Sequence, residues 1–124
     1  MRSKWIEYRG KQIFYQDFSN LMYNAEALKQ ELEAMQQIVL QQPPSSTLVL
    51  ADFRNTQITP DVMPLLNSAS ARTKSHVRKT AVLGVVGLKR TLGDLLMKLT
   101  GQPLKYFDNE TLAKEWLTQD EDLS

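Results

Sequence analysis

The sequence predicts a single-domain α/β fold, in which about four helices cover a mixed, mostly parallel sheet of about five strands. One observation is the run 81–86, Ala-Val-Leu-Gly-Val-Val, which is unbroken, apolar and partly β-branched. Such a run is typical of a strand buried on both faces of a sheet. The second observation is that from Leu88 the apolar residues recur at a spacing near 3.6, so that a helix follows once Gly87 has ended the strand. A buried strand that leads directly into a helix predicts layers of helix and sheet.

The first two segments predict a β-hairpin. Residues 5–8 and 12–18 are rich in aromatic and β-branched side chains, which favour strands. Between them, Gly10 can adopt the positive φ that a tight turn needs. We therefore expect two antiparallel strands joined at Gly10, on one side of the sheet.

A helix is predicted after the hairpin. Ser19 or Asn20 can cap its amino end, because short polar side chains accept a hydrogen bond from the first turn. Pro43-Pro44 prevents its continuation. The apolar residues recur at alternating steps of four and three, and they are Leu21, Ala25, Leu28, Leu32, Met35 and Val39. This stripe also fits a coiled-coil seam, but it is short and ends at prolines, so packing on the sheet is favoured.

The next strand and helix are predicted over residues 47–75. The apolar run 47–53 is expected to be a buried strand, followed by a polar loop. Thr59 and Pro60 are predicted to begin the second helix, as its cap and its first helical residue. The apolar face of this helix consists of Val62, Leu65, Leu66 and Ala69. Its small, polar end, residues 68–75, is expected to fray.

A third helix is predicted over residues 88–100, directly after the central strand. Five of its residues form one apolar sector, and they are Leu88, Leu92, Leu95, Leu96 and Leu99. Gly101 is expected to end the helix, and Gly93 inside it costs about 1 kcal/mol relative to alanine. The favoured interpretation is a core-facing stripe with a solvated basic back. Because glycines lie within and at both ends of this helix, the alternative hypothesis is that it is the mobile lid of a binding site.

A short strand and a helix complete the predicted fold, in the order β-β-α-β-α-β-α-β-α. The strand is expected at 104–107, and Asp108 or Asn109 caps the helix that follows. The inward face of that helix consists of Leu112, Ala113, Trp116 and Leu117. We expect one domain over residues 1–118 and an acidic, frayed tail over residues 119–124.

Composition excludes several classes of protein. The formal net charge is +1 over 124 residues, so no nucleic-acid partner is predicted. The chain has no cysteine and no apolar run long enough to cross a bilayer, and its first residues lack the apolar core of a signal peptide. These features predict a cytoplasmic protein with no disulfide and no integral membrane segment.

Charge is distributed unevenly along the chain. Residues 72–105 contain eight basic side chains and one acidic side chain, a net charge of +7. Residues 106–124 contain one base and six acids, a net charge of −5. The favoured interpretation is two solvated faces, which neutralise one another in part.

The inventory of reactive side chains argues against an enzyme. His76 is the single histidine and is expected on the surface, at the entrance of the central strand, so zinc sites and a catalytic triad lack ligands and a base. Asp52 and Asp108 follow predicted parallel strands and could form a carboxylate pair, but their roles in a turn and a cap explain them better. The segment 84–91 invites comparison with a phosphate-binding loop, but it has neither the Walker nor the dinucleotide pattern. No cofactor and no metal are predicted.

Two stretches, together with the order of the elements, resemble the SpoIIAA-like family of STAS-type domains. One is the strand motif 78–84, Arg-Lys-Thr-Ala-Val-Leu-Gly. The other is the ending Tyr106-Phe107-Asp108, followed by Ala113 and Trp116-Leu117. The resemblance covers nearly the whole chain and implies the STAS-like fold. It implies either a bacterial regulatory module that binds proteins, as anti-sigma antagonists do, or lipid binding, as in the related CRAL-TRIO transfer proteins.

The chain departs from the antagonist pattern at the regulatory switch. Antagonists carry an Asp-Ser-Ser-Gly type sequence where a loop enters the helix after the third strand, and its serine is phosphorylated. Here residues 58–62 are Ile-Thr-Pro-Asp-Val, with neither serine nor glycine. Thr59 or Thr56 could accept a phosphate, but Asp61 would repel one in the first turn, and a capping role is favoured for Thr59.

The sequence therefore predicts a non-catalytic module that acts by binding. One hypothesis is a protein–protein interaction through the loops at the carboxyl ends of the strands or through helix 88–100. The alternative is an apolar or lipid ligand held under that helix, and an enzyme is the third and least favoured interpretation. The candidate binding residues are Arg54, Thr56, Thr59, Gly87, Lys89, Arg90, Leu92 and Leu96. The sequence does not identify the partner, and it leaves a homodimer and peripheral contact with a membrane surface open.

Overall fold

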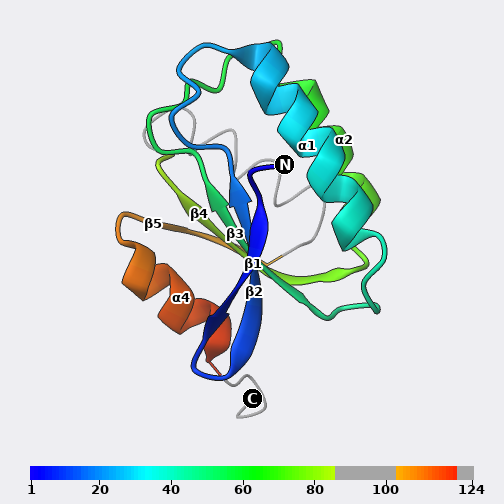
Figure 1. Ribbon diagram of the computed structural model, residues 1–124, viewed down its shortest axis with the longest axis vertical. Helices are drawn as coiled ribbons and strands as arrows, with labels where there is room; N and C mark the ends of the chain where they lie inside the picture. Colours follow the sequence, from blue (N-terminus) through cyan, green and yellow to red (C-terminus); the bar gives the residue numbers. More distant parts are fainter. Residues whose placement is uncertain (86–102, 120–124) are drawn as a thin grey trace.

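The computed structural model describes residues 1–85 and 103–119 of the chain (Figure 1). Along the sequence its elements are β1 (Lys4–Tyr8), β2 (Lys11–Asp17), α1 (Ala25–Val39), β3 (Thr47–Asp52), α2 (Met63–Thr73), β4 (Val77–Leu83), β5 (Leu104–Phe107) and α4 (Glu110–Thr118). The predicted helix 88–100 and most of the predicted tail lie outside the described residues. The other predicted strands and helices are present, with different bounds in several cases.

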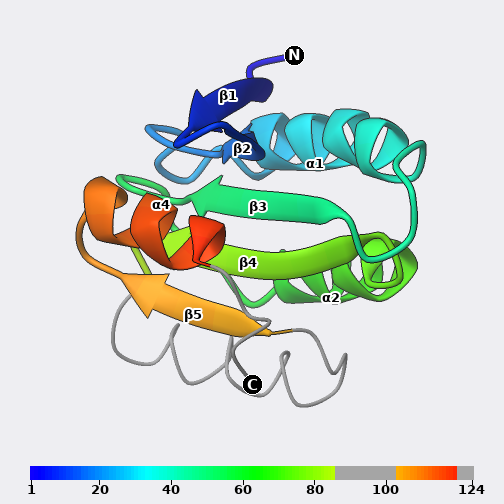
Figure 2. The same ribbon diagram turned by 90° about the horizontal axis from the view of Figure 1, so that it is seen from below.

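The five strands form one sheet in the order β1-β2-β3-β4-β5. Strand β1 pairs antiparallel with β2, and the other neighbours pair in parallel. The mixed, mostly parallel sheet with the hairpin on one side is thus confirmed. Helices α1 and α2 cover one face of the sheet and α4 covers the other (Figures 1 and 2).

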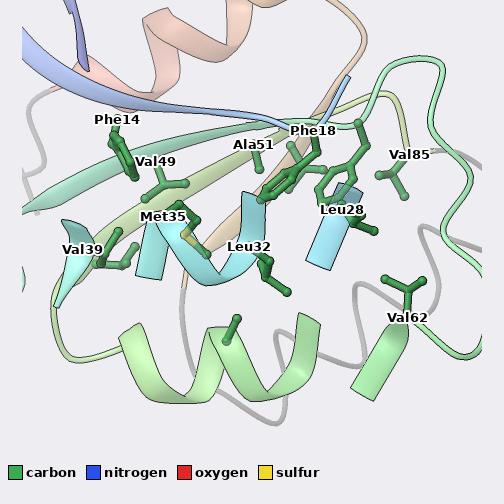
Figure 3. Close-up of a cluster of buried hydrophobic side chains, with 14 residues drawn as sticks. Phe14, Phe18, Leu28, Leu32, Met35, Val39, Val49, Ala51, Val62 and Val85 are labelled. Carbon is green, nitrogen blue, oxygen red and sulfur yellow. The ribbon is translucent and has the colours of Figure 1, made fainter. Parts of the chain in front are cut away.

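Each face of the sheet has its own hydrophobic core. Val49 and Ala51 of β3 point toward α1 and α2, where they meet residues such as Leu32 and Met35 (Figure 3). The alternate residue Leu50 belongs to the core beneath α4. Every residue of β3 is buried, since a parallel strand in the middle of a covered sheet has no face in solvent. The predicted burial of Val49, Leu50 and Val82 is confirmed, and Val86, also predicted to be buried, lies outside the described residues.

The central strand β4 ends earlier than the sequence predicted. It spans Val77–Leu83 rather than 81–86, and it ends at Gly84, which has a φ of 84°, rather than at Gly87. The reason is the loop after β3, which crosses β4 at this point. The Phe53 amide donates to the Leu83 carbonyl (2.9 Å), and a Cβ at position 84 would lie 2.5 Å from the Arg54 nitrogen. Only glycine fits beneath this crossing.

Helix α1 begins later than predicted, and its cap is Asn24 rather than Ser19 or Asn20. The Asn24 side chain accepts a hydrogen bond from the Ala27 amide (3.0 Å). Residues 18–22 cannot be helical, because three of their amides bind the end of β3 and the loop after it. Phe18 donates to Asp52 (3.0 Å), Asn20 to Arg54 (2.8 Å) and Met22 to Asn55 (3.0 Å), in each case at the carbonyl oxygen. At its other end α1 stops at Val39, before the two prolines.

Both ends of α2 also differ from the prediction. Thr59 does not cap it, since residues 59–62 form a turn and the helix begins at Met63, with Pro64 in its first turn. The end that was expected to fray stays helical to Thr73. The hydroxyl of this buried residue donates to the Ala69 carbonyl (2.8 Å), so a polar side chain is satisfied inside the packed layer.

Helix α4 is capped by Asn109, as predicted, whose side chain accepts from the Leu112 amide (3.0 Å). Ala113 and Leu117 face the sheet, but Leu112 is 60% exposed, so its predicted inward position is wrong. Lys79, which the sequence placed on a solvated basic face, is only 2% exposed. Its ammonium donates to the Trp116 carbonyl (2.8 Å), because the last carbonyls of a helix have no partner within the helix.

The crossing at Gly84 leads to a stability prediction. Gly84→Ala should lower the free energy of unfolding by about 3 kcal/mol or more, because it adds backbone strain at positive φ to a clash with the main chain. Gly10→Ala is the matched control. Gly10 also has positive φ, but a Cβ added there would have no atom within 4 Å, so strain alone should cost about 1–2 kcal/mol. Urea denaturation measures both, and equal losses would contradict a steric role for Gly84.

Candidate functional site

Two loops meet at the edge of the sheet where its parallel strands end. Residues 18–24 follow β2 and residues 53–57 follow β3, and together we call them the double loop (Figure 1). Besides the three amides described above, the Gln57 amide donates to the Met22 carbonyl (2.7 Å), and Met22 and Thr56 form a parallel β-bridge. The two loops therefore continue the pairing of β2 with β3 beyond the strands.

The candidate residue Thr56 lies inside the double loop. Its buried hydroxyl donates to the Phe18 carbonyl and accepts from the Leu21 amide (3.0 Å). This side chain therefore joins the two loops to each other and does not offer its hydroxyl to solvent. Thr59, the other candidate threonine, is half-buried and donates its hydroxyl to the carboxylate of Asp61.

The buried carboxylate of Asp52 organises the polar part of this edge. Asp52 is 1% exposed and accepts two hydrogen bonds from the Arg54 guanidinium, from Nε (3.0 Å) and Nη2 (2.7 Å). It also accepts from the Arg54 amide (3.0 Å) and the Tyr15 hydroxyl (2.6 Å). Arg54 Nη2 then reaches Glu110 at the start of α4 (3.1 Å). The candidate residue Arg54 thus connects the double loop to α4.

The pKa values of this cluster lie away from neutrality. Burial by itself would raise the pKa of Asp52, but hydrogen bonds from Arg54 and Tyr15 outweigh it and hold that pKa below its ordinary value. Burial and the bond to Asp52 raise the pKa of Tyr15, and the bond to Asp52 raises the pKa of Arg54. At neutral pH the carboxylate is ionised, the phenol is neutral and the guanidinium is charged. These groups are suited to holding a geometry rather than to moving protons.

Large apolar side chains are exposed on the double loop and on α4, the two elements that Arg54 connects. Among the described residues, Met22 is 59% exposed and Tyr23 is 75% exposed, both in the double loop, and Leu112 of α4 is 60% exposed. The Asn55 side chain donates to that of Asn20 (2.9 Å), which ties the two loops together beside these residues. We define the carboxyl-edge surface as Met22, Tyr23, Arg54, Asn55 and Leu112.

Sequence reasoning identified only Arg54 of this surface. A signal for two others was present, because Met22 and Tyr23 fall outside the apolar stripe of α1 and have no place in the core. Leu112 gave no such signal, since it continues the apolar pattern of α4. The candidates Gly87, Lys89, Arg90, Leu92 and Leu96 lie outside the described residues.

A second feature is an apolar cavity of about 120 Å³ between the sheet and helices α1 and α2. Its walls include Leu32 and Met35 of α1, Leu66 and Ala69 of α2, and strand residues such as Val82 (Figure 3 shows part of this core). Among the described residues at its wall, the polar ones are Gln16, Ser70, Thr73, Thr80 and Tyr106. The cavity could hold a small apolar group.

Within residues 1–85 and 103–119, no group of three or more histidine, cysteine or acidic side chains is placed to hold a metal ion. His76 lies at the entrance of β4, as predicted, but it is half-buried, with Nδ1 2.7 Å from the Gln42 carbonyl oxygen. None of the described helices is both long and apolar enough to cross a membrane.

The mostly parallel sheet, with two helices on one face and α4 on the other, and the paired loops at its carboxyl edge define a STAS-like domain. The chain belongs to the SpoIIAA-like family, whose model matches residues 19–118. The comparison with curated proteins and the comparison with solved structures each returned no match. The family is one of regulatory, protein-interacting domains, and its match begins at the double loop and includes the whole carboxyl-edge surface.

The Asp52–Arg54 pair predicts a pH-dependent loss of stability. Arg54→Met should lower the free energy of unfolding by about 2–4 kcal/mol at pH 7, because it leaves a buried carboxylate without its countercharge. Because the pKa of Asp52 is lower in the folded protein than in the unfolded chain, its ionised carboxylate stabilises the fold at any pH above the unfolded-state pKa of about 3.9. This stabilisation is lost as the pH falls through the folded-state pKa. The cost of Arg54→Met should therefore shrink near pH 3.

Urea denaturation at both pH values, with an NMR titration of the Asp52 carboxyl, measures this effect. Lys114→Met is the control, since it breaks the more exposed pair between Lys114 and Glu110 (2.8 Å) and should cost less than about 1 kcal/mol. An Arg54→Met cost that is the same at pH 3 and pH 7 would show that the charge of Asp52 is not what Arg54 stabilises.

Proposed function

We propose that this protein is a non-catalytic regulatory module that binds a protein partner through the carboxyl-edge surface. The observation that carries the proposal is the exposure of Met22 and Tyr23 on a loop whose backbone is hydrogen-bonded to the loop after β3. Folding normally removes large apolar side chains from water, and tyrosine and methionine are enriched at protein interfaces. A loop whose backbone holds two such side chains in solvent is suited to binding a partner protein.

Backbone strain supports the same conclusion. Asn20, Met22 and Asn55 all have positive φ, at 58°, 54° and 59°. Asparagine tolerates this conformation, but for methionine it costs about 1–2 kcal/mol. The hydrogen bonds of the double loop offset this cost and hold the surface in one conformation. A preformed surface loses little conformational entropy on binding, and strain of this kind is concentrated at functional sites.

Arg54 supplies a polar anchor within the surface. Its guanidinium is fixed by the buried Asp52, while its side chain remains 47% exposed. Arginine and tyrosine dominate the energetic centres of protein interfaces, because each combines an apolar surface with directed hydrogen bonds. The non-catalytic part of the proposal is supported by the pKa shifts of this cluster, which move its groups away from the neutral range that general acid–base catalysis requires.

Site-specific cross-linking tests this surface. A photoreactive residue at Tyr23, introduced in the protein's own host, should form a covalent adduct with one partner protein. The same residue at Glu33, exposed on α1, should not form this adduct. With the purified partner, the double variant Met22→Ser/Tyr23→Ser should weaken binding by about 30-fold or more, as expected for removal of two central apolar contacts.

Glu33→Ser serves as the control for affinity, because it removes an exposed side chain of α1 that lies outside the carboxyl-edge surface. It should leave the dissociation constant for the partner within about threefold of the wild-type value. A partner that cross-links equally from Glu33, or that binds the double variant as tightly as the wild type, would refute the carboxyl-edge surface as the interface.

The cavity supports a second candidate function, the binding of an apolar ligand, for which the family resemblance suggests a lipid. Its volume of about 120 Å³ limits the size of a ligand that could bind there. An engineered apolar cavity of about 150 Å³ admits benzene, so this one has room for a ring or a short acyl segment rather than a whole lipid. The predicted helix 88–100 lies outside the described residues, and the cavity alone supports this second function.

A cavity-filling pair of variants tests this second function. Ser70 lines the cavity on α2, whereas Ser68 is exposed on the same helix. Benzene and hexanoate should shift the NMR signals of Ala69 and Val82 in the wild type and in Ser68→Leu. Ser70→Leu should abolish these shifts, because its side chain occupies the space. No shift in the wild type at about 10 mM probe, far above millimolar affinity, would exclude the function for both probes.

A further inference from the structure

Strand β1 forms an outer edge of the sheet. It pairs with β2 on one side, and among the described residues no segment pairs with its other side (Figure 2). An open strand edge presents backbone amides and carbonyls that can pair with another chain. Which residues present them follows from the geometry of the hairpin.

The two-residue turn at Arg9-Gly10 determines which residues of β1 direct their backbone groups toward β2 and which direct them outward. Both turn residues have positive φ, 52° and 78°, as in the tight hairpin turns that match the twist of a sheet. Such a turn makes the flanking residues, Tyr8 and Lys11, a hydrogen-bonded pair. Pairs alternate along an antiparallel ladder, so the amides and carbonyls of Trp5 and Glu7 point outward from the sheet.

We propose that β1 pairs with β1 of a second copy of this chain, antiparallel, with Ile6 on the two-fold axis. Trp5 of each copy then exchanges two backbone hydrogen bonds with Glu7 of the other, so both outward-facing residues are satisfied. The two neighbouring symmetric registers are disfavoured. A register centred on Trp5 needs the Ser3 amide, which already donates to Glu31 (2.7 Å). A register centred on Glu7 places two like charges directly opposite each other.

The side chains of this register are complementary on both faces of the sheet. Trp5, whose ring packs on Phe14 (centroids 5.0 Å apart), lies opposite Glu7 of the second copy, and an indole N–H can donate to a carboxylate. On the α4 face Lys4 lies opposite Tyr8 of the second copy. The hydroxyl of Tyr8 donates to Glu115 (2.7 Å), which also pairs with Arg9 (2.7 Å), so a lysine there meets an aromatic ring beside an acid that is shared with Arg9.

Charged residues on an edge strand usually prevent association, and Lys4 and Glu7 would oppose pairing in most registers. In the proposed register each instead faces a group that it can bind, and the half-buried Ile6 meets its own copy at the axis. The two sheets then become continuous. Since the axis is perpendicular to the sheet, the two carboxyl-edge surfaces point in opposite directions, and the dimer presents two partner sites at its opposite ends.

Sedimentation equilibrium of the full chain tests the dimer. The small interface predicts a dissociation constant of about 10–100 µM. Glu7→Pro removes an outward amide but no amide that pairs with β2, and proline is accepted on edge strands, so it should yield a folded monomer. Glu7→Gln is the matched control, because it keeps the amide and the side-chain length, and it should weaken the dimer by less than about tenfold.

Lys4→Glu provides a second variant that does not alter the backbone. It places an acid next to Glu115 of the second copy and should weaken the dimer by about tenfold or more. Circular dichroism confirms that each variant is folded. A wild-type monomer at every concentration up to about 1 mM, or a dimer that survives both Glu7→Pro and Lys4→Glu, would overturn the proposal. The partner affinity of monomeric Glu7→Pro reports on the carboxyl-edge surface independently.

Discussion

The buried carboxylate of Asp52 is the constraint on which the rest of the carboxyl edge depends. An ionised carboxylate without partners is too costly to bury, so the chain after β3 must turn back at once to bring the amide and guanidinium of Arg54 onto it. That turn lays the backbone of residues 53 and 54 across the end of β4, which is why Gly84 stands there. It also sets the direction of residues 55–57, along which the loop after β2 is hydrogen-bonded.

The same constraint explains how apolar side chains can remain in solvent without weakening the fold. The double loop satisfies its own backbone groups by pairing with itself, as strands do, and Thr56 fills its interior. Met22 and Tyr23 are therefore not needed in the core and remain exposed to solvent. Stability here comes from the buried polar cluster and the loop ladder, and the proposed binding would use the side chains that the ladder turns outward.

The two faces of the sheet are closed in different ways. On one face α1 and α2 pack apolar side chains against β3 and β4, and a small cavity remains between these layers. On the other face the described helix is α4. It is held at both ends by charged groups from the sheet side, with Glu110 bound by Arg54 at its start and the carbonyl of Trp116 bound by Lys79 at its end. A short helix with a small apolar face depends on such end contacts more than a long one does.

For residues 1–85 and 103–119, the sequence by itself determined which strands and helices form and that they pack in layers, because these follow from periodicity. The apolar run of β3, the stripe of α1 and the cap at Asn109 are local patterns, and β3 has both of its faces buried, as its unbroken run predicted. The sequence also placed Arg54 at the carboxyl edge. Only the tertiary structure decided that Ser19 and Asn20 lie in a paired loop, that Lys79 is buried and that Leu112 is exposed. The physical reason is that each of these outcomes depends on a hydrogen bond or a packing contact with residues distant in sequence, which local spacing does not encode.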